Sequence, residues 1–302
     1  MSKSANFWQS IEFSEKEFNE LRDVVYDLTG IALKDNKREM LYSRLSKRLR
    51  QLNLKSFSAY ITLLKGPKQQ DELGHLVNAV TTNLTRFFRE SHHYDHLQKV
   101  VIPQIIARAD KGNISPFLIW SAGCSSGMEA YSAAMVIYRH LPKKYHKLVK
   151  ILATDIDTNM INTGKEACYQ TKHKETLPLE YQKYFAQDSK DDKYSHIVEE
   201  VKKFVHFKYL NLLHKWPMTK NFDVIFCRNV MIYFDKPTRN TLVNRYKDQL
   251  LEDGYIYLGH AESLVGQEVD VKAIGKSIFQ KFKTGEEVNR TSQLAAFRRQ
   301  LS

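Results

Sequence analysis

The chain has 302 residues, 42% hydrophobic and 26% charged, which is typical of a globular protein. Its formal net charge of +12 favours an acidic partner. The same charge is explained equally well by lysines and arginines whose only role is to keep exposed helices solvated. No apolar run has the length of a membrane span, no secretory signal opens the chain, and no zinc-finger or RNP-like motif indicates nucleic acid. The three cysteines lack CxxC spacing, so we expect a cytoplasmic protein without membrane insertion.

The first part of the chain, to about residue 111, has the apolar periodicity of helices. One predicted helix, residues 13–29, stops at Gly30, and another, residues 60–64, is capped by Ser56. Residues 71–80 continue the helical pattern. The helix at residues 37–52 has an apolar stripe with a basic edge, formed by Leu41, Leu45, Leu49 and Leu52 and by Arg44, Lys47 and Arg48.

From residue 115 onward, short apolar runs alternate with helical segments. The predicted strands are residues 117–122, 150–154, 204–210, 222–227 and 255–258, and the predicted helices are 129–138, 159–164 and 236–251. This alternation favours an α/β fold, a mostly parallel sheet with helices on both faces. Residues 169–201 are highly charged, so we expect a surface insertion rather than a core element, and residues 285–302 are a predicted tail.

A glycine-containing loop, WSAGCSSG at residues 120–127, lies between a predicted strand and a predicted helix. Gly123 and Gly127 allow a tight turn close to a ligand, although an ordinary strand-to-helix turn explains them equally well. The next strand ends in Asp155, whose carboxylate can accept hydrogen bonds from both hydroxyls of a ribose, and Glu129 is placed to serve the same ligand. Together these features indicate an adenosine-containing ligand rather than a particular reaction.

Two further segments bring polar groups to the same predicted edge of the sheet. The strand at 222–227 delivers Arg228 and Asn229, and Tyr233 follows as a residue of an acceptor pocket or as a packing tyrosine. Residues 83–89, NLTRFFR, lie at the hinge between the helical part and the sheet. Their adjacent aromatic rings either close over a ligand or pack the hinge.

In this order, the segments NLTRFFRE, WSAGCSSGMEAYSAAM, ATDID, YLNLL, FDVIFCRNVMIYFD and YLGHAESL resemble the CheR family of chemotaxis methyltransferases. The resemblance covers nearly the whole chain, to about Phe282. It implies an N-terminal helical domain and hinge at residues 1–90. A class I, Rossmann-like S-adenosylmethionine methyltransferase domain then follows at residues 91–284, with a small β-subdomain inserted at 169–201.

The resemblance also implies which residues contact the methyl donor: Asn83, Thr85, Arg89, Glu129, Asp155, Asn211, Leu212, Arg228 and Asn229. The family usually reads GEEPYS where this chain has GMEAYS, so Met128 and Ala130 are departures. Some members dock a receptor's C-terminal pentapeptide on the β-subdomain through turns rich in glycine and arginine. Residues 187–200, QDSKDDKYSHIVEE, contain no glycine, so we do not expect that docking here.

The implied reaction transfers a methyl group from S-adenosylmethionine to glutamates on the cytoplasmic helices of chemoreceptors, leaving S-adenosylhomocysteine. Glutamate is ionised near neutral pH, so neither a general base nor a metal is required. His92, His93 and His96 share a helix face, but we expect no metal there. The receptor segments are helical and acidic, so Arg44, Lys47 and Arg48 are expected to bind them.

The expected partner is therefore a chemoreceptor cytoplasmic domain and not nucleic acid, and the expected state is a monomer. Three alternatives stay open. They are a methyltransferase of RNA or a small molecule, an adaptor of the same fold that binds receptors or ligands without turnover, and a nicotinamide oxidoreductase. The last lacks the expected glycine fingerprint.

Overall fold

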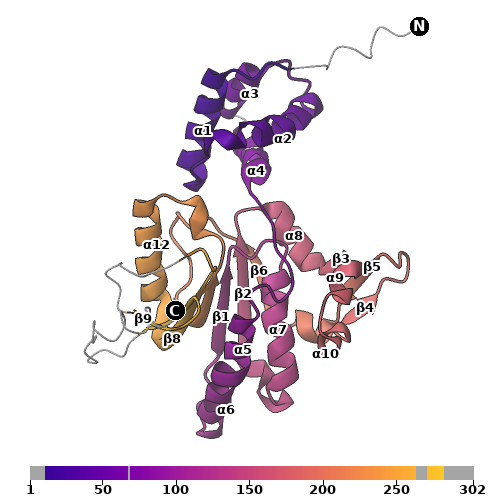
Figure 1. Cartoon of the computed structure of the whole chain (residues 1–302), viewed down its shortest axis with the longest axis vertical. Helices are drawn as coiled ribbons and strands as arrows, with labels where there is room; N and C mark the ends of the chain where they lie inside the picture. The colour runs from indigo at the N-terminus through magenta and orange to yellow at the C-terminus, as the bar shows by residue number, and fades with distance from the viewer. Residues whose placement is uncertain (1–10, 67–68, 263–270, 282–302) are drawn as a thin grey trace, which may run out of the picture. The chain divides into compact units, whose positions relative to one another are not determined.

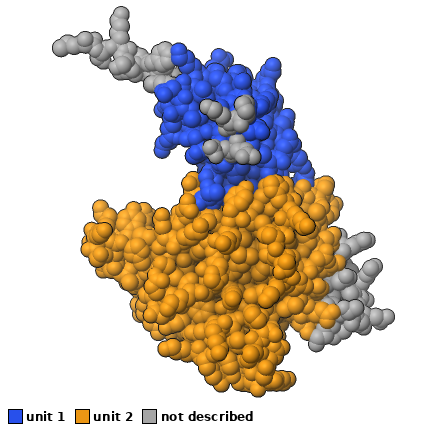
Figure 2. Space-filling view, turned by 180° about the vertical axis from the view of Figure 1, so that it is seen from behind, with its two compact units in different colours: residues 1–82, 156–158, 233–235 blue, residues 83–155, 159–232, 236–302 orange. Residues whose placement is uncertain are grey.

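The computed structural model describes residues 11–66, 69–262 and 271–281. The chain divides into two compact units (Figure 2): residues 1–82 with 156–158 and 233–235, and residues 83–155, 159–232 and 236–302. Within the described residues, every helix is too short or too polar to cross a membrane. The predicted tail at residues 285–302 lies outside the described residues.

The first unit is all-helical, as predicted. Its elements are α1 (Glu15–Thr29), the 3-10 turn η1 (Asp35–Lys37), α2 (Arg38–Gln51), α3 (Phe57–Leu64) and α4 (Gln69–Val80). Ser14 begins α1 through a reciprocal capping box with Glu17, and Gly30 ends it with a φ of 69°. Leu41, Leu45 and Leu49 of α2 are fully buried, and Leu52, the residue after α2, is partly buried against the same cluster, which confirms the predicted apolar stripe.

The second unit contains a seven-stranded mixed sheet in the order β6-β2-β1-β7-β8-β10-β9 (Figure 1). Its strands are β1 (Phe117–Ala122), β2 (Val149–Asp155), β6 (Val205–Tyr209), β7 (Phe222–Cys227), β8 (Leu250–Leu258), β9 (Val271–Gly275) and β10 (Ile278–Lys281). The first five pair in parallel, and β10 pairs antiparallel with both β8 and β9. The predicted α/β class is therefore confirmed.

Helices cover both faces of this sheet because the side chains of a strand alternate between the faces. On β1, Ile119 belongs to the main core cluster with α7, whereas Trp120 contacts Tyr246 of α12. The helical elements of the unit are α5 (His92–His96), η2 (Leu97–Val101), α6 (Ile102–Asp110), α7 (Met128–His140), η3 (Lys143–Leu148), α8 (Thr158–Glu166), η4 (Met231–Tyr233) and α12 (Lys236–Gln249).

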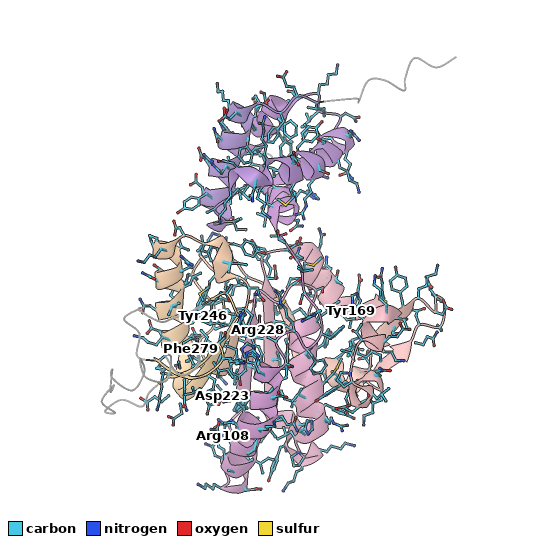
Figure 3. The ribbon with its side chains drawn as sticks, in the orientation of Figure 1. Arg108, Tyr169, Asp223, Arg228, Tyr246 and Phe279 are labelled. Carbon is cyan, nitrogen blue, oxygen red and sulfur yellow. The ribbon has the colours of Figure 1, made fainter. Side chains whose placement is uncertain are left out.

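The insertion forms a second, three-stranded sheet in the order β3-β5-β4. Its elements are β3 (Cys168–Gln170), α9 (Thr171–Glu175), α10 (Leu179–Gln182), β4 (Phe185–Gln187), β5 (Tyr194–Ile197) and α11 (Glu199–Lys202). The expectation of a surface insertion rather than a core element was wrong for part of this segment. Tyr169 (labelled in Figure 3), Phe185 and Ile197 are buried in the main core cluster. Charged residues dominate the composition of this segment, so composition alone did not reveal the alternating apolar residues that reach the core.

Candidate functional site

The candidate site lies at the carboxyl edge of the parallel strands, where the loops after β1, β2 and β7 begin. Ala122 pairs with Thr154 in the register of β1 and β2, so both strands end at the same level. The amides of Gly123 and Cys124 donate to the carbonyl of Thr154 at 2.8 and 2.9 Å, and Leu210 N donates to the carbonyl of Asp155 at 3.0 Å. The backbone therefore fixes these loops against one another.

Two positions in the first loop require glycine. Gly123 has a φ of +81°, and a Cβ there would lie 2.3 Å from Cγ2 of Val230. Gly127 has a φ of +86°, and its Cβ would lie 2.7 Å from the ring of Phe207 and 3.2 Å from Cα of Gly164. Both positions combine a left-handed backbone with a close approach that no other residue allows. The predicted tight turn is thus confirmed, and the loop packs directly against Val230, Phe207 and Gly164.

Asp155 organises this loop as well as being the expected ribose partner. Its carboxylate Oδ2 accepts from the backbone N–H of Ser125 at 2.7 Å, and the residue is buried. Ser125 Oγ in turn donates to the carbonyl of Asn83 at 3.3 Å. The first predicted residue of the hinge motif therefore meets the glycine loop and the end of β2 at one place.

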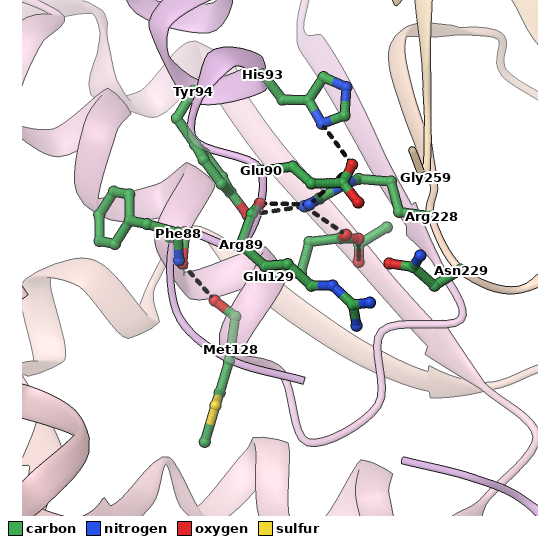
Figure 4. Close-up of polar contacts among 12 residues, drawn as sticks. Phe88, Arg89, Glu90, His93, Tyr94, Met128, Glu129, Arg228, Asn229 and Gly259 are labelled. Atoms are coloured by element: carbon green, nitrogen blue, oxygen red, sulfur yellow. Dashed lines mark hydrogen bonds and ion pairs between the residues drawn. The ribbon is translucent and has the colours of Figure 1, made fainter. Parts of the chain in front are cut away.

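Arg228 is the centre of a buried polar network (Figure 4), and its side chain is only 2% exposed. Its Nη1 donates to Glu129 Oε2 at 3.1 Å and to the hydroxyl of Tyr94 at 3.3 Å. Its Nε donates to Glu90 Oε2 at 3.4 Å, and its Nη2 donates to the carbonyl of Arg89. One guanidinium therefore joins the end of β7 to the start of α7 and to the hinge motif.

The charges in this network favour a fixed arrangement. Glu129 also accepts from Ser121 Oγ at 2.7 Å. Burial raises the pKa of Glu129, and the positive charge of Arg228 opposes that rise. A buried carboxylate that has a cation and a hydroxyl as partners stays in one place, and removal of either partner is costly. Glu129 and Arg228 thus hold the site together, and their predicted direct contacts with a donor stay predictions.

A second buried carboxylate, Glu262, holds the loop after β7. It accepts from the N–H of Gly259 at 2.6 Å and from the N–H groups of four consecutive residues, Asn229 (2.9 Å), Val230 (3.0 Å), Met231 (2.8 Å) and Ile232 (3.3 Å). Asn229 has a φ of 59°, an uncommon conformation that this carboxylate stabilises. Sequence reasoning missed Glu262, although YLGHAESL carries the signal: an acid shortly after a strand end and a glycine.

The hinge motif packs on the protein core. Phe87 makes edge contacts with the rings of Tyr169 and Phe185 at 5.1 and 5.2 Å, and Phe88 lies 4.5 Å from Tyr181. The packing interpretation of these two rings is therefore the one that the structure supports. Arg89 donates to the carbonyl of Leu84 at 2.9 Å. Thr85 is half-buried in the same segment.

Asn211 and Leu212 follow β6 at the same edge. The side-chain oxygen of Asn211 accepts from Leu213 N at 3.0 Å, and the carbonyl of Leu212 accepts from Trp216 Nε1 at 3.0 Å. These contacts shape the loop, and a direct role of either residue in donor binding stays a prediction.

The predicted acceptor-side residues lie in the first unit. Tyr233 donates to the carbonyl of Thr82 at 3.5 Å. Arg48 pairs with the buried Glu72 at 2.7 Å, and Arg44 donates to the carbonyls that end α4, those of Ala79 (2.9 Å) and Thr81 (2.6 Å). Lys47 is exposed. Of the predicted basic edge, Lys47 and Arg44 are therefore exposed, and both arginines make hydrogen bonds within the unit.

The residues at the carboxyl edge fit an adenosyl methyl donor. The glycine loop turns tightly at this edge, because Gly123 and Gly127 adopt a left-handed backbone with Val230 and Phe207 packed against them. Asp155 supplies a buried carboxylate of the kind that binds ribose hydroxyls. Neither feature depends on a metal or on a general base.

The chain is similar to known proteins over most of its length. Residues 83–279 match the family described as "CheR methyltransferase, SAM binding domain", and residues 16–81 match "CheR methyltransferase, all-alpha domain". A "Chemotaxis protein methyltransferase" of Borreliella burgdorferi is 38% identical over 86% of this chain and 92% of its own length. "Chemotaxis protein methyltransferase 2" of Pseudomonas aeruginosa is 37% identical over 90% and 95%, and the Escherichia coli protein is 33% identical over 90% and 92%.

Proposed function

The chain belongs to the CheR methyltransferase family and uses S-adenosylmethionine, and on that premise we propose that it methylates glutamate side chains on the cytoplasmic helices of chemoreceptors. The products are glutamyl methyl esters and S-adenosylhomocysteine. The observation that carries the proposal is the site itself: a buried carboxylate, Asp155, beside a glycine loop that is locked by its neighbours.

The reaction requires alignment more than acid–base chemistry. S-adenosylmethionine, when bound, supplies an electrophilic methyl group, and a glutamate carboxylate is already ionised near neutral pH. Correct orientation of the two reactants with water excluded is worth about 7 kcal/mol or more in favourable cases. A site whose loops are fixed by buried networks suits that task.

The named side chains divide this work between them. Asp155 binds the ribose hydroxyls and keeps Ser125 in place through its amide. Arg228 and Glu129 fix the relative positions of the strand ends and the hinge motif. Glu262 fixes residues 229–232, which lead directly to Tyr233, the proposed residue of the acceptor pocket.

The acceptor is an acidic helical segment of a receptor that this chain meets in the cytoplasm. The net charge of +12 supports such a partner, because opposite charges steer association. Lys47 and Arg44 of the predicted basic edge are both exposed, and Lys47 is the one we favour because Arg44 already donates to the carbonyls of Ala79 and Thr81. Tyr233 and the two arginines remain proposed acceptor-side residues.

The proposal is tested with labelled S-adenosylmethionine and purified receptor cytoplasmic fragments. We expect label in the fragment that base releases as methanol, and none in a fragment whose methylation-site glutamates are replaced by alanine. Base-stable label, or label in RNA with a steep salt dependence, would favour a different substrate class. Receptor binding without any turnover would favour the adaptor alternative.

A further inference from the structure

The outer face of the three-stranded sheet gathers three side chains of different chemistry. Cys168 of β3 lies directly across from His196 of β5, and His196 lies across from Ala186 of β4. Directly opposed residues of antiparallel strands point to the same face. Asp188 lies two residues beyond Ala186 and so returns to that face. Figure 1 shows β3, β4 and β5 grouped together, apart from the carboxyl edge of the large sheet.

These side chains are close enough to share one ion. One ligand atom each from Cys168, Asp188 and His196 lies within 4.8 Å of the other two. Oδ2 of Asp188 is 2.5 Å from Nε2 of His196. The cluster is open to solvent, because the side chains of His196 and Asp188 are 41% and 22% exposed. We propose that Cys168, Asp188 and His196 form a zinc-binding site that ties together the three strands of the insertion.

The ligand set selects the ion. A thiolate, an imidazole and a carboxylate are the side chains that bind Zn²⁺, whereas Ca²⁺ and Mg²⁺ prefer oxygen ligands alone. Three protein ligands leave a fourth tetrahedral position for water. Ligand atoms about 2.0 to 2.3 Å from zinc lie roughly 3.4 Å apart in a tetrahedral arrangement. The histidine and the aspartate therefore separate by about 1 Å when the ion replaces the hydrogen bond between them.

The surroundings prepare the carboxylate for this role. Oδ1 of Asp188 accepts from the backbone N–H groups of Lys190 (2.7 Å) and Asp191 (3.1 Å), which orients Oδ2 towards the histidine. The contact between Oδ2 of Asp188 and Nε2 of His196 shows that these two ligand atoms already meet on one face. A bound cation favours the thiolate form of Cys168, which is the form that ligates zinc.

A second group of potential ligands, Glu90, His92 and His93, lies in the described part of the chain. Glu90 already pairs with Arg228 there, and His93 is fully buried against the ring of Tyr257. The insertion site differs because Cys168 and His196 come from separate strands, Asp188 directly follows a third strand, and His196 and Asp188 are partly exposed. Zinc there stabilises a small sheet and takes no part in methyl transfer.

The test is titration of the metal-free full-length protein with ZnCl₂, followed by calorimetry. We expect one ion to bind tightly. Cys168→Ser and His196→Ala should each weaken that binding by more than about 100-fold, because the loss of a residue that only hydrogen-bonds to a metal ligand already costs about 10- to 100-fold in affinity. His206→Ala, which changes an exposed histidine on β6, is the matched control and should leave zinc affinity unchanged. S-adenosylhomocysteine affinity, measured in parallel, shows that each variant is folded.

A second measurement on the unaltered protein does not depend on the folding of any variant. CoCl₂ should give a thiolate-to-cobalt charge-transfer band, which added ZnCl₂ removes. The absence of that band, zinc affinity that is equal in wild type and Cys168→Ser, or preference for CaCl₂ would each overturn the proposal. None of these outcomes bears on methyl transfer, so the two proposals fail separately.

Discussion

The replacement Arg228→Met tests the central network most severely. It removes the cation that Glu129 and Glu90 share and leaves both carboxylates largely buried, with side chains 11% and 14% exposed. Removal of one partner from a buried ion pair costs about 3–5 kcal/mol. For a domain of this size each kcal/mol lowers the melting temperature by about 2–4 °C, so we expect a fall of about 6–20 °C in thermal unfolding followed by circular dichroism.

Two further measurements separate this explanation from simple loss of packing. The double variant Arg228→Met with Glu129→Gln should be more stable than Arg228→Met alone, because it removes one uncompensated charge. Glu129 has a folded-state pKa above its unfolded value, so its contribution is present at low pH and is lost as pH rises through the folded pKa. Arg228 opposes the rise of the Glu129 pKa, so its loss raises that pKa further, and the deficit of Arg228→Met should be larger at about pH 8 than at about pH 5. A cost below about 1 kcal/mol, or a deficit independent of pH, would refute the reasoning.

Other replacements probe the glycine loop and the first unit. Gly123→Ala should destabilise the fold and weaken S-adenosylhomocysteine binding in calorimetry, because the added Cβ would lie 2.3 Å from Cγ2 of Val230. Adding Val230→Ala should restore part of both losses, and a double variant without any recovery would contradict the steric explanation. Arg48→Ala should cost about 1–3 kcal/mol in urea unfolding. Burial raises the pKa of Glu72, but hydrogen bonds from Arg48 and the hydroxyl of Tyr60 lower it overall. The stability that the Arg48–Glu72 pair contributes should therefore be present above pH about 4.5 and lost as pH falls through the folded pKa of Glu72. A cost of Arg48→Ala that does not depend on pH would argue against the pair. Lys47→Glu should slow receptor methylation in the labelled-donor assay without changing stability, and an unchanged rate would exclude this lysine from the acceptor surface.

The sequence predicted those parts of the site that follow from strand order. Parallel strands bring their carboxyl ends to one edge, so the alternation of strands and helices is enough to place Asp155 and Arg228 at the same edge. The glycine positions were likewise predictable, because a left-handed turn between a strand and a helix limits the residue type.

The partners of these residues could not be predicted in the same way. Glu90 lies 138 residues before Arg228, and Glu262 lies 33 residues after Asn229, and no periodicity links such pairs. The cluster of Cys168 with His196 depends on the register of two short strands, which the charged turn between them conceals. Composition likewise misjudged residues 169–201, because a few alternating apolar side chains bury their face of the small sheet.

The most direct test of the account is calorimetric titration of S-adenosylhomocysteine into the folded full-length protein and into Asp155→Ala, with Asp95→Asn on the exposed face of α5 as a control. We expect one binding site in the wild type and in the control, and a loss of about 1.5–3 kcal/mol in Asp155→Ala, as for hydrogen bonds to a charged group. Equal affinity in all three proteins, or no binding to folded wild type, would contradict the assignment of this edge to the methyl donor.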